Sequence, residues 1–454
     1  MNAANRLLQE DIPGLIRQIG LPVGIGVLFN NLFQVVDTFY AGALSKEALA
    51  ALALSFPIYF IIIGLGSGLG TGASALIGNA LGADDRALAA HYAAQGLILT
   101  ALLSLVTAIV GLAISPNLFE ILGAQGAGVD YNMSYITPIF QGALFFNLVF
   151  MFHAALSAQG ETRPFRNFLA LGFALNLILD PWFIYGGLGL PALGIAGVGV
   201  ATSLIQALGS VYLGWRAARS GIFAGFRARW LLPDRSRIWQ IIKQGAPPAL
   251  DLSTVSVGGF VVTYFVSRFG SDAVAAYGIA SRLDGLIWIP LVGLDVATLV
   301  LVAQNNGARR YDRMWTAYHT ALRYGFALMI ISGVVVFVFA YELVSIFTAE
   351  PAIIETGVVY IRISALSLWS KPLGFIGFAA LRGIKKPLLP MVISMMRMIV
   401  LPALMLHALV SVLDGGLLSI WWTITGITVA TGLFAGFCVQ RLMPRAATIA
   451  APPR

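Results

Sequence analysis

The chain has 454 residues, of which 58% are hydrophobic and only 11% are charged, and its mean hydropathy is +0.85. A soluble globular chain carries about 25% charged residues, so this composition excludes an ordinary soluble protein. The formal net charge of +8 does not indicate a nucleic-acid partner, because Arg and Lys gather between long apolar segments, where they set membrane topology. Cys438 is the only cysteine, which excludes an intrachain disulfide and a cysteine-based metal cluster.

Twelve apolar segments are long enough to cross about 30 Å of hydrocarbon, which predicts an all-α membrane protein. In chain order they are 21–42, 52–80, 92–114, 132–156, 165–187, 194–215, 247–268, 275–303, 318–341, 357–380, 387–409 and 416–440. The amphipathic segment before them has no apolar run ending in a cleavage site, so we expect an interfacial helix rather than a signal peptide. The predicted division is an interfacial segment 1–20, an N-lobe 21–215, an inter-lobe loop 216–246, a C-lobe 247–440 and a tail 441–454.

Basic residues fall unevenly on the two sides of the predicted spans. Of the 28 Lys and Arg residues, 22 lie on the side of the termini, 4 lie on the other side, and Lys371 and Arg397 fall inside spans. The side richer in Lys and Arg is usually the cytoplasmic one. We therefore expect a multi-pass protein of a bacterial-type inner membrane, with both termini and the 216–246 loop in the cytoplasm.

The two halves of the chain resemble each other in one constant register. Ala48-Leu49-Ala50-Ala51 matches Ala273-Val274-Ala275-Ala276, and the starting residues differ by 225. Three further pairs keep this offset: Gly82-Ala83 with Gly307-Ala308, Tyr135-Ile136 with Tyr360-Ile361, and Ala155-Leu156 with Ala380-Leu381. We infer a duplication of six plus six helices. Parallel repeats of this kind place a substrate cavity between the two lobes.

Carboxylates inside membrane spans are costly and mark candidate functional sites. We assign five residues to a polar stripe of the N-lobe, of which the first three follow the helical spacing i, i+4, i+7: Asn30, Gln34, Asp37, Thr202 and Gln206. Asn176 and Asp180 share a face of the fifth span, and Asp180 lies at a depth similar to that of Asp37. We therefore expect the two carboxylates to meet.

The acidic pair belongs to one lobe only. The 225-residue register puts Val262 opposite Asp37 and Met405 opposite Asp180. Structural scaffolding should repeat with the duplication, so the asymmetry favours a functional pair. The alternative, two carboxylates held only by structural hydrogen bonds, stays open.

Three charged residues of the C-lobe lie about ten to twelve residues from the cytoplasmic ends of their spans, a similar depth in a helix that rises 1.5 Å per residue. Asp295, Lys371 and Arg397 are thus expected to meet near mid-membrane. We interpret them as an internal charge network rather than a binding site, because pairing is how buried charges are usually tolerated. Asp251 follows Pro247-Pro248 at a cytoplasmic helix end, where we expect it to be solvated.

Pro22 is a candidate hinge of the first span, fifteen residues before Asp37. Proline removes one helical hydrogen bond, which makes bending easier at that point. The alternative is a proline tolerated in the first turn of the helix.

The chain contains the strings Leu21-Pro22, Val36-Asp37-Thr38, Gly78-Asn79-Ala80-Leu81-Gly82-Ala83, Ala155-Leu156-Ser157-Ala158-Gln159-Gly160, Asn176-Leu177-Ile178-Leu179-Asp180-Pro181 and Ala380-Leu381-Arg382-Gly383. Over essentially its whole length it resembles the MATE (multidrug and toxic compound extrusion) family of transporters, and most of all the DinF-type branch. The resemblance implies two six-helix lobes in a V-shaped antiporter that needs no cofactor. It also implies that Asp37, Asn176 and Asp180 form the cation site.

One departure from the NorM-type pattern concerns the C-lobe. Val255 and Lys371 stand where that pattern has a Glu and an Asp. Lysine cannot coordinate Na⁺, so we expect coupling to run through the N-lobe and to use H⁺, because two close carboxylates in a low dielectric cannot both ionise cheaply. Na⁺ held by Asp37, Asn176 and Asp180 stays open.

We predict a proton-coupled multidrug efflux antiporter that acts as a monomer, and whose partners are small, mostly cationic organic compounds and membrane lipids, with no nucleic acid. A flippase for lipid-linked precursors is an alternative, and it would be expected to have a more cationic central cavity. A membrane-embedded enzyme is a second alternative. Against it, His91, His153, His319 and His407 form no HExxH or other metal-binding spacing.

Overall fold

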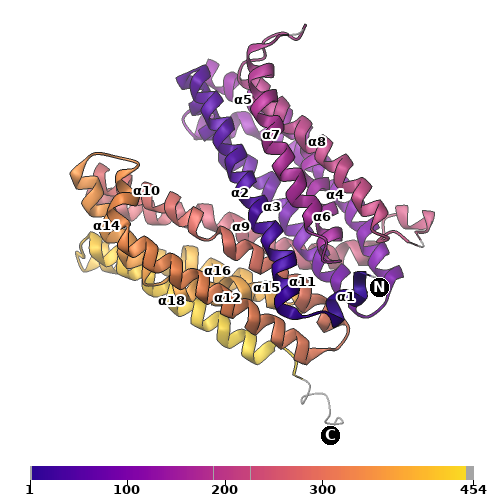
Figure 1. Ribbon diagram of the computed structural model, residues 1–454. Coiled ribbons are helices and arrows are strands. Elements are labelled where there is room, and N and C mark those ends of the chain that lie inside the picture. Colours follow the sequence, from indigo (N-terminus) through magenta and orange to yellow (C-terminus); the bar gives the residue numbers. More distant parts are fainter. Residues whose placement is uncertain (1–2, 188, 225, 446–454) are drawn as a thin grey trace. The chain divides into compact units, whose positions relative to one another are not determined.

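All regular secondary structure in the computed structural model is helical within the described residues, which are 3–187, 189–224 and 226–445 (Figure 1). The first half contains α1 (Ala3–Gln9), α2 (Ile12–Leu44), α3 (Lys46–Gly82), α4 (Arg86–Ile121), α5 (Ala127–Gln141), α6 (Ala143–Ser157), α7 (Arg163–Tyr185), α8 (Ile195–Arg219) and η1 (Ala228–Leu231). The second half contains α9 (Arg235–Val266), η2 (Ser267–Phe269), α10 (Ser271–Ile287), α11 (Ile289–Gly307), α12 (Tyr311–Val338), α13 (Ala340–Ser345), α14 (Pro351–Ala365), η3 (Leu368–Ser370), α15 (Lys371–Gly383), α16 (Leu388–Met395), η4 (Met396–Val400), α17 (Leu401–Leu406), η5 (His407–Val412) and α18 (Leu417–Leu442).

The number of membrane-crossing segments agrees with the sequence. Within the described residues, eleven helical runs are long and apolar enough to cross a bilayer, and the bent pair α5–α6 makes a twelfth. The prediction of an all-α protein with twelve spans is confirmed. Most of the predicted tail 441–454 lies outside the described residues.

The predicted span 132–156 consists of two helices that meet at Gly142 with a bend of 45°. Ser203 of α8 donates a hydrogen bond of 2.8 Å to the carbonyl oxygen of Pro138 in the last turn of α5. A Cβ atom at Gly142 would lie 2.7 Å from Oγ of Ser203. The bend therefore lies where a neighbouring side chain satisfies a helix carbonyl and where only glycine fits.

The predicted span 275–303 is also interrupted. α10 ends at Ile287 and α11 begins at Ile289, with Pro290 at its second position. Proline has no backbone N–H and disfavours the helical conformation of the preceding residue, so it accounts for the break. Leu65 holds the equivalent register position in α3, which is continuous there.

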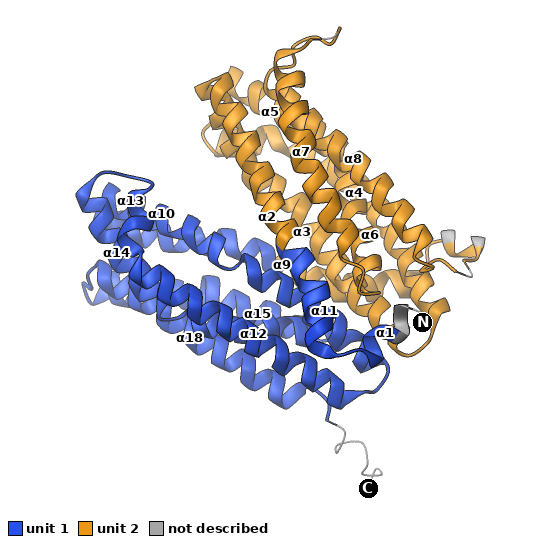
Figure 2. Ribbon diagram, viewed as in Figure 1, with its two compact units in different colours: residues 1–24, 251–454 blue, residues 25–250 orange. Residues whose placement is uncertain are grey.

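The chain divides into two compact units (Figure 2). The C-terminal unit comprises residues 1–24 and 251–454, and the N-terminal unit comprises residues 25–250. The boundaries fall inside α2 and inside α9. Each half of the chain therefore contributes the start of its first long helix to the unit that the other half forms.

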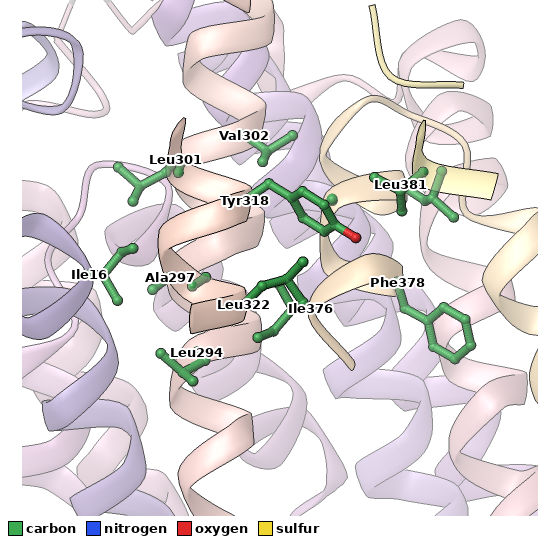
Figure 3. Close-up of a cluster of buried hydrophobic side chains, with 14 of the residues drawn as sticks. Ile16, Leu294, Ala297, Leu301, Val302, Tyr318, Leu322, Ile376, Phe378 and Leu381 are labelled. Atoms are coloured by element: carbon green, nitrogen blue, oxygen red, sulfur yellow. The ribbon is translucent and has the colours of Figure 1, made fainter. Parts of the chain in front are cut away.

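The apolar face of residues 7–19 packs in the core of the C-terminal unit, whereas we expected residues 1–20 to form an interfacial helix. α2 already begins within this segment, and Ile16 packs in one apolar cluster with Leu294 of α11 (Figure 3). Arg313 of α12 donates a hydrogen bond of 2.6 Å to the carbonyl oxygen of Glu10, just after α1. The difference arises because the apolar face of this segment finds a protein partner, which sequence periodicity cannot distinguish from a membrane surface.

Glycine pairs make a close helix crossing in each unit. In the C-terminal unit, a Cβ atom at Gly293 of α11 would lie 2.4 Å from the carbonyl oxygen of Gly20 in α2. In the N-terminal unit, a Cβ atom at Gly245 of α9 would lie 3.0 Å from the carbonyl oxygen of Gly68 in α3. Gly20 and Gly245 differ by 225 residues, as do Gly68 and Gly293. The internal repeat is thus also found in the helix packing, because equivalent glycines let two helix backbones come close together in each unit.

Candidate functional site

Asn176 of α7 links two buried carboxylates in the N-terminal unit. Its Nδ2 atom donates one hydrogen bond to Oδ1 of Asp37 in α2 and another to Oδ1 of Asp180, each 2.9 Å long. Asn176 and Asp180 are fully buried, and Asp37 is 7% exposed. Because both oxygens contact the same nitrogen, they lie within twice that distance of each other. These three residues, hereafter the N-lobe site, come together as their spacing and depth led us to expect, and their role in coupling stays a prediction.

Local helix geometry positions this site. Asn176 and Asp180 are one helical turn apart in α7, so their side chains project from the same face. The hydroxyl group of Tyr40 in α2 donates a hydrogen bond of 3.3 Å to the carbonyl oxygen of Leu177, which holds α2 against α7 one turn after Asp37. The site is therefore built on two neighbouring helices rather than on a loop.

Two buried oxygens of the N-lobe site, Oδ1 of Asn176 and Oδ2 of Asp180, accept no hydrogen bond from the described residues. Leaving such a buried group unsatisfied costs about 1–3 kcal/mol, and more when it is charged. A proton on one carboxyl group would remove one of two neighbouring negative charges and add a donor. The arrangement is therefore chemically suited to binding a proton or another small cation.

Two tyrosines that the sequence analysis did not assign to the site lie near Asp37. They are Tyr59 of α3 and Tyr135 of α5. Tyr59 also packs edge-on against Phe146, with 5.9 Å between the ring centroids. Nothing in their local sequence distinguishes them from ordinary packing aromatics, so only the fold could identify them as neighbours of the acidic pair.

The other residues of the predicted polar stripe are not joined to the N-lobe site. The hydroxyl group of Thr202 donates a hydrogen bond of 2.9 Å to the carbonyl oxygen of Val198 in its own helix. The side chains of Asn30, Gln34 and Gln206 are partly exposed and form no hydrogen bond with the described residues. Their assignment to substrate binding stays a prediction.

Pro22 lies inside a continuous helix. α2 begins at Ile12, so the proline is ten residues beyond its start, and its side chain is buried. The alternative of a proline in the first turn is therefore wrong. A hinge at Pro22 stays a prediction.

The ion pairs of the C-terminal unit differ from the predicted network of Asp295, Lys371 and Arg397. Nζ of Lys371 lies 3.1 Å from Oδ1 of Asp284 in α10. Nη1 of Arg382 lies 3.7 Å from Oδ1 of Asp295 in α11. Lys371 and Arg382 are eleven residues apart at opposite ends of α15, which corresponds to about 16 Å along the helix axis. The two side chains therefore pair with different carboxylates.

Asp251 is paired rather than merely solvated. Nη2 of Arg382 donates a hydrogen bond of 2.6 Å to its Oδ2 atom, and the Asp251 side chain is only 16% exposed. Arg382 follows the predicted span 357–380 and was not part of the predicted network. Its long side chain reaches back to bridge Asp251 of α9 and Asp295 of α11.

Within the described residues, no three His, Cys, Asp or Glu side chains are grouped so that they could hold a metal ion. The Na⁺ alternative of the sequence analysis combines the side-chain oxygen of Asn176 with the two carboxylates of the N-lobe site, and it stays a prediction.

Residues 22–182 and 247–406 both match the sequence profile of the MatE family, and the two matches begin 225 residues apart. A Shewanella oneidensis protein named FAD transporter is 29% identical over 420 residues, which cover 91% of this chain and 92% of that protein. A probable multidrug resistance protein of Bacillus subtilis is 27% identical over 368 residues, covering 79% and 78% of the two chains. The structure of a MOP superfamily transporter from Pyrococcus furiosus matches with a TM-score of 0.89 at 25% identity, covering 96% of this chain and 97% of that one.

Proposed function

The chain belongs to the MatE family of multidrug efflux transporters, and we propose that it exports amphipathic, mostly cationic organic compounds in exchange for H⁺ by alternating access. The observation that carries the proposal is the single amide of Asn176 that donates to both Asp37 and Asp180. The proteins it resembles are transporters rather than enzymes. Assignment to the DinF-type branch remains part of the proposal.

Proton coupling follows from the energetics of two close carboxylates. Both can be ionised only at a high cost in a low dielectric, so the site tends to hold one proton. When the cavity opens outward, a second proton neutralises the site and removes its attraction for a cationic compound. Proton and substrate then compete for the same negative charge, which is the thermodynamic basis of exchange.

The orientation of Asn176 supports H⁺ over Na⁺ as the coupling ion. The amide turns its donor nitrogen, rather than its oxygen, toward both carboxylates. A sodium ion between these carboxylates would need oxygen ligands on all sides, and the NH₂ group would repel it. A proton requires no such rearrangement.

The comparisons restrict the class of transported compound only loosely. The relative from Bacillus subtilis is named for multidrug resistance, which supports organic compounds as substrates. The relative from Shewanella oneidensis is named for FAD, so the family resemblance does not restrict the cargo to cations. A flippase for lipid-linked precursors is the competing function.

The test is transport by purified protein in liposomes, with H⁺ and Na⁺ gradients imposed separately. We expect a cationic dye to move under the H⁺ gradient alone, and a requirement for Na⁺ would contradict the proposed coupling. Translocation of a fluorescent lipid-linked saccharide without dye transport would favour the flippase.

We also propose that the protein is a monomer in a bacterial-type inner membrane, with both termini in the cytoplasm, as the distribution of its basic residues suggests. A reporter fused near Arg229 should be cytoplasmic, and a periplasmic reporter would overturn this topology.

A further inference from the structure

The helix of the C-terminal unit that is equivalent to α7 has a cation, rather than an acid, inside its membrane span. The 225-residue register places Arg397 opposite Gly172, which is one helical turn before Asn176 in α7. Leu401 and Met405 hold the positions of Asn176 and Asp180. The segment equivalent to residues 172–180 of α7 therefore has a cation and apolar side chains where α7 has Asn176 and Asp180.

Arg397 lacks a protein partner for its guanidinium group. Among the described residues it forms no hydrogen bond and no ion pair. The carboxylates of Asp251 and Asp284 act on it electrostatically, but they already bind Arg382 and Lys371 at 2.6 and 3.1 Å. The side chain is only partly buried, so its five N–H donors remain open to an acceptor from outside the protein.

The depth of Arg397 indicates what kind of acceptor this is. Arg397 is nine residues beyond the start of the span Leu388–Val412, which places it about 14 Å along that helix. The hydrocarbon core is about 30 Å thick, so Arg397 is near its middle. A phospholipid headgroup in its normal position does not reach this depth, whereas a transported solute does.

Two further features surround Arg397. The helix passes through a π-helical turn at Met396–Val400, a deformation that is frequent at functional sites. Five of the 11 methionines of the chain lie in the span Leu388–Val412: Met391, Met395, Met396, Met398 and Met405. Met396, which directly precedes the arginine, is 41% exposed. Methionine is flexible and polarisable and is common on surfaces that accept apolar groups of different shapes.

We propose that the segment Met396–Val400 is a subsite for the acidic group of an amphipathic solute, with Arg397 binding a carboxylate, phosphate or sulfonate and Met396 contacting the apolar body. The inference rests on the proposed transport function and extends its cargo from cations to zwitterions and anions. The Asp284–Lys371 pair beside the arginine stays intact, because the incoming anion is neutralised by Arg397.

Equilibrium binding to the full-length protein in phosphatidylcholine nanodiscs tests this proposal. The probes are rhodamine B, which has a free carboxylate, and its ethyl ester, which does not. We expect Arg397→Gln to weaken rhodamine B binding about tenfold or more, the value expected for loss of a charge-assisted hydrogen bond, and to leave ester binding unchanged. Arg397→Lys should retain part of the affinity for rhodamine B.

Arg282→Gln is the matched control, because Arg282 is an exposed arginine of the same unit. It should change the affinity for neither dye. Equal affinities of wild type and Arg397→Gln for rhodamine B, or an equal loss for both dyes, would overturn the subsite. Ester binding also reports whether the variant is folded.

Replacing part of the phosphatidylcholine with phosphatidylglycerol distinguishes a solute from a lipid. If the anionic lipid displaces rhodamine B from the wild-type protein, the acidic group at Arg397 comes from lipid, and the solute assignment is wrong. No gradient is present in this assay. Failure of proton coupling would therefore leave the binding result intact, and failure of the subsite would leave dye efflux under an H⁺ gradient intact.

Discussion

In the N-terminal unit, two buried carboxylates share one amide donor, whereas the C-terminal unit has a cation beside each of its interior carboxylates Asp251, Asp284 and Asp295. The two halves nevertheless keep one 225-residue register, and their close glycine crossings are equivalent. Duplication has therefore preserved the packing of the helices while the charges diverged. The half whose acids lack cationic partners is the one suited to exchange protons.

The largest effect is expected from Asp37→Asn, which keeps the size and hydrogen-bonding capacity of the side chain but removes its titration. Without a group whose charge changes during the cycle, substrate and proton no longer compete, and H⁺-driven dye efflux should fall at least tenfold. The measurement is efflux from proteoliposomes at matched protein content. Asp180→Asn should impair efflux as well.

The control for these two variants is Asp130→Asn, because Asp130 is an exposed acid of the same unit. Asp251, which the sequence presented as a solvated control, is unsuitable because it binds Arg382. Normal transport by Asp37→Asn would show that the coupling site lies elsewhere.

Arg382→Gln should have the largest effect on the stability of the C-terminal unit. It leaves Asp251 and Asp295 facing each other without a cation. Removing one partner of a buried pair costs 3–5 kcal/mol, and since the Arg382 side chain is 13% exposed we expect about 2 kcal/mol here. Thermal unfolding in detergent measures the loss. Adding Asp251→Asn should restore part of it, and failure of this rescue would contradict the bridging role.

The N-lobe site could be predicted because the sequence of a membrane helix indicates both the face on which a residue lies and its depth in the membrane. The spacing of Asn176 and Asp180 fixes their common face, and the count of residues from the helix end fixes their depth. Because Asp37 lies at a similar depth on the first span, a contact between the two carboxylates was the simplest arrangement. The twelve spans followed from the length of the apolar segments, and the register of the repeat followed from matching residues in the two halves.

The ion pairs of the C-lobe could not be predicted, because Lys and Arg side chains reach several ångströms along the helix. The predicted depths grouped Lys371 with Asp295. In the structure Lys371 pairs with Asp284, and Arg382 pairs with Asp295. Helix interruptions limit prediction as well. The π-helical turn at Met396–Val400 leaves no signature in an apolar segment.

A moderate loss of stability is expected from Gly293→Ala. The new methyl group would lie 2.4 Å from the carbonyl oxygen of Gly20, so the two backbones must separate, at a cost of about 1–2 kcal/mol, in the lower part of the range for overpacked interiors. Gly245→Ala, at the equivalent crossing of the N-terminal unit, should lose a similar amount. Gly278→Ala serves as the control, because nothing lies within 4 Å of its Cβ position. A large loss for one crossing and none for the other in thermal unfolding would show that the crossings are not equivalent.

The smallest effect is expected from Lys371→Ala. The pair with Asp284 is partly solvated, since the carboxylate is 29% exposed, so we expect a loss of about 1 kcal/mol in the free energy of unfolding and slower transport. The coupling ion should not change, because no proton-exchanging carboxylate is assigned to this unit. Thermal unfolding measures the first effect, and dye efflux under separate H⁺ and Na⁺ gradients measures the second. Lys46→Ala, at an exposed lysine of the other unit, should alter neither quantity. If Lys371→Ala made efflux depend on Na⁺, the lysine would be excluding sodium from Asp284, and the two units would differ in ion selectivity rather than in whether they couple at all.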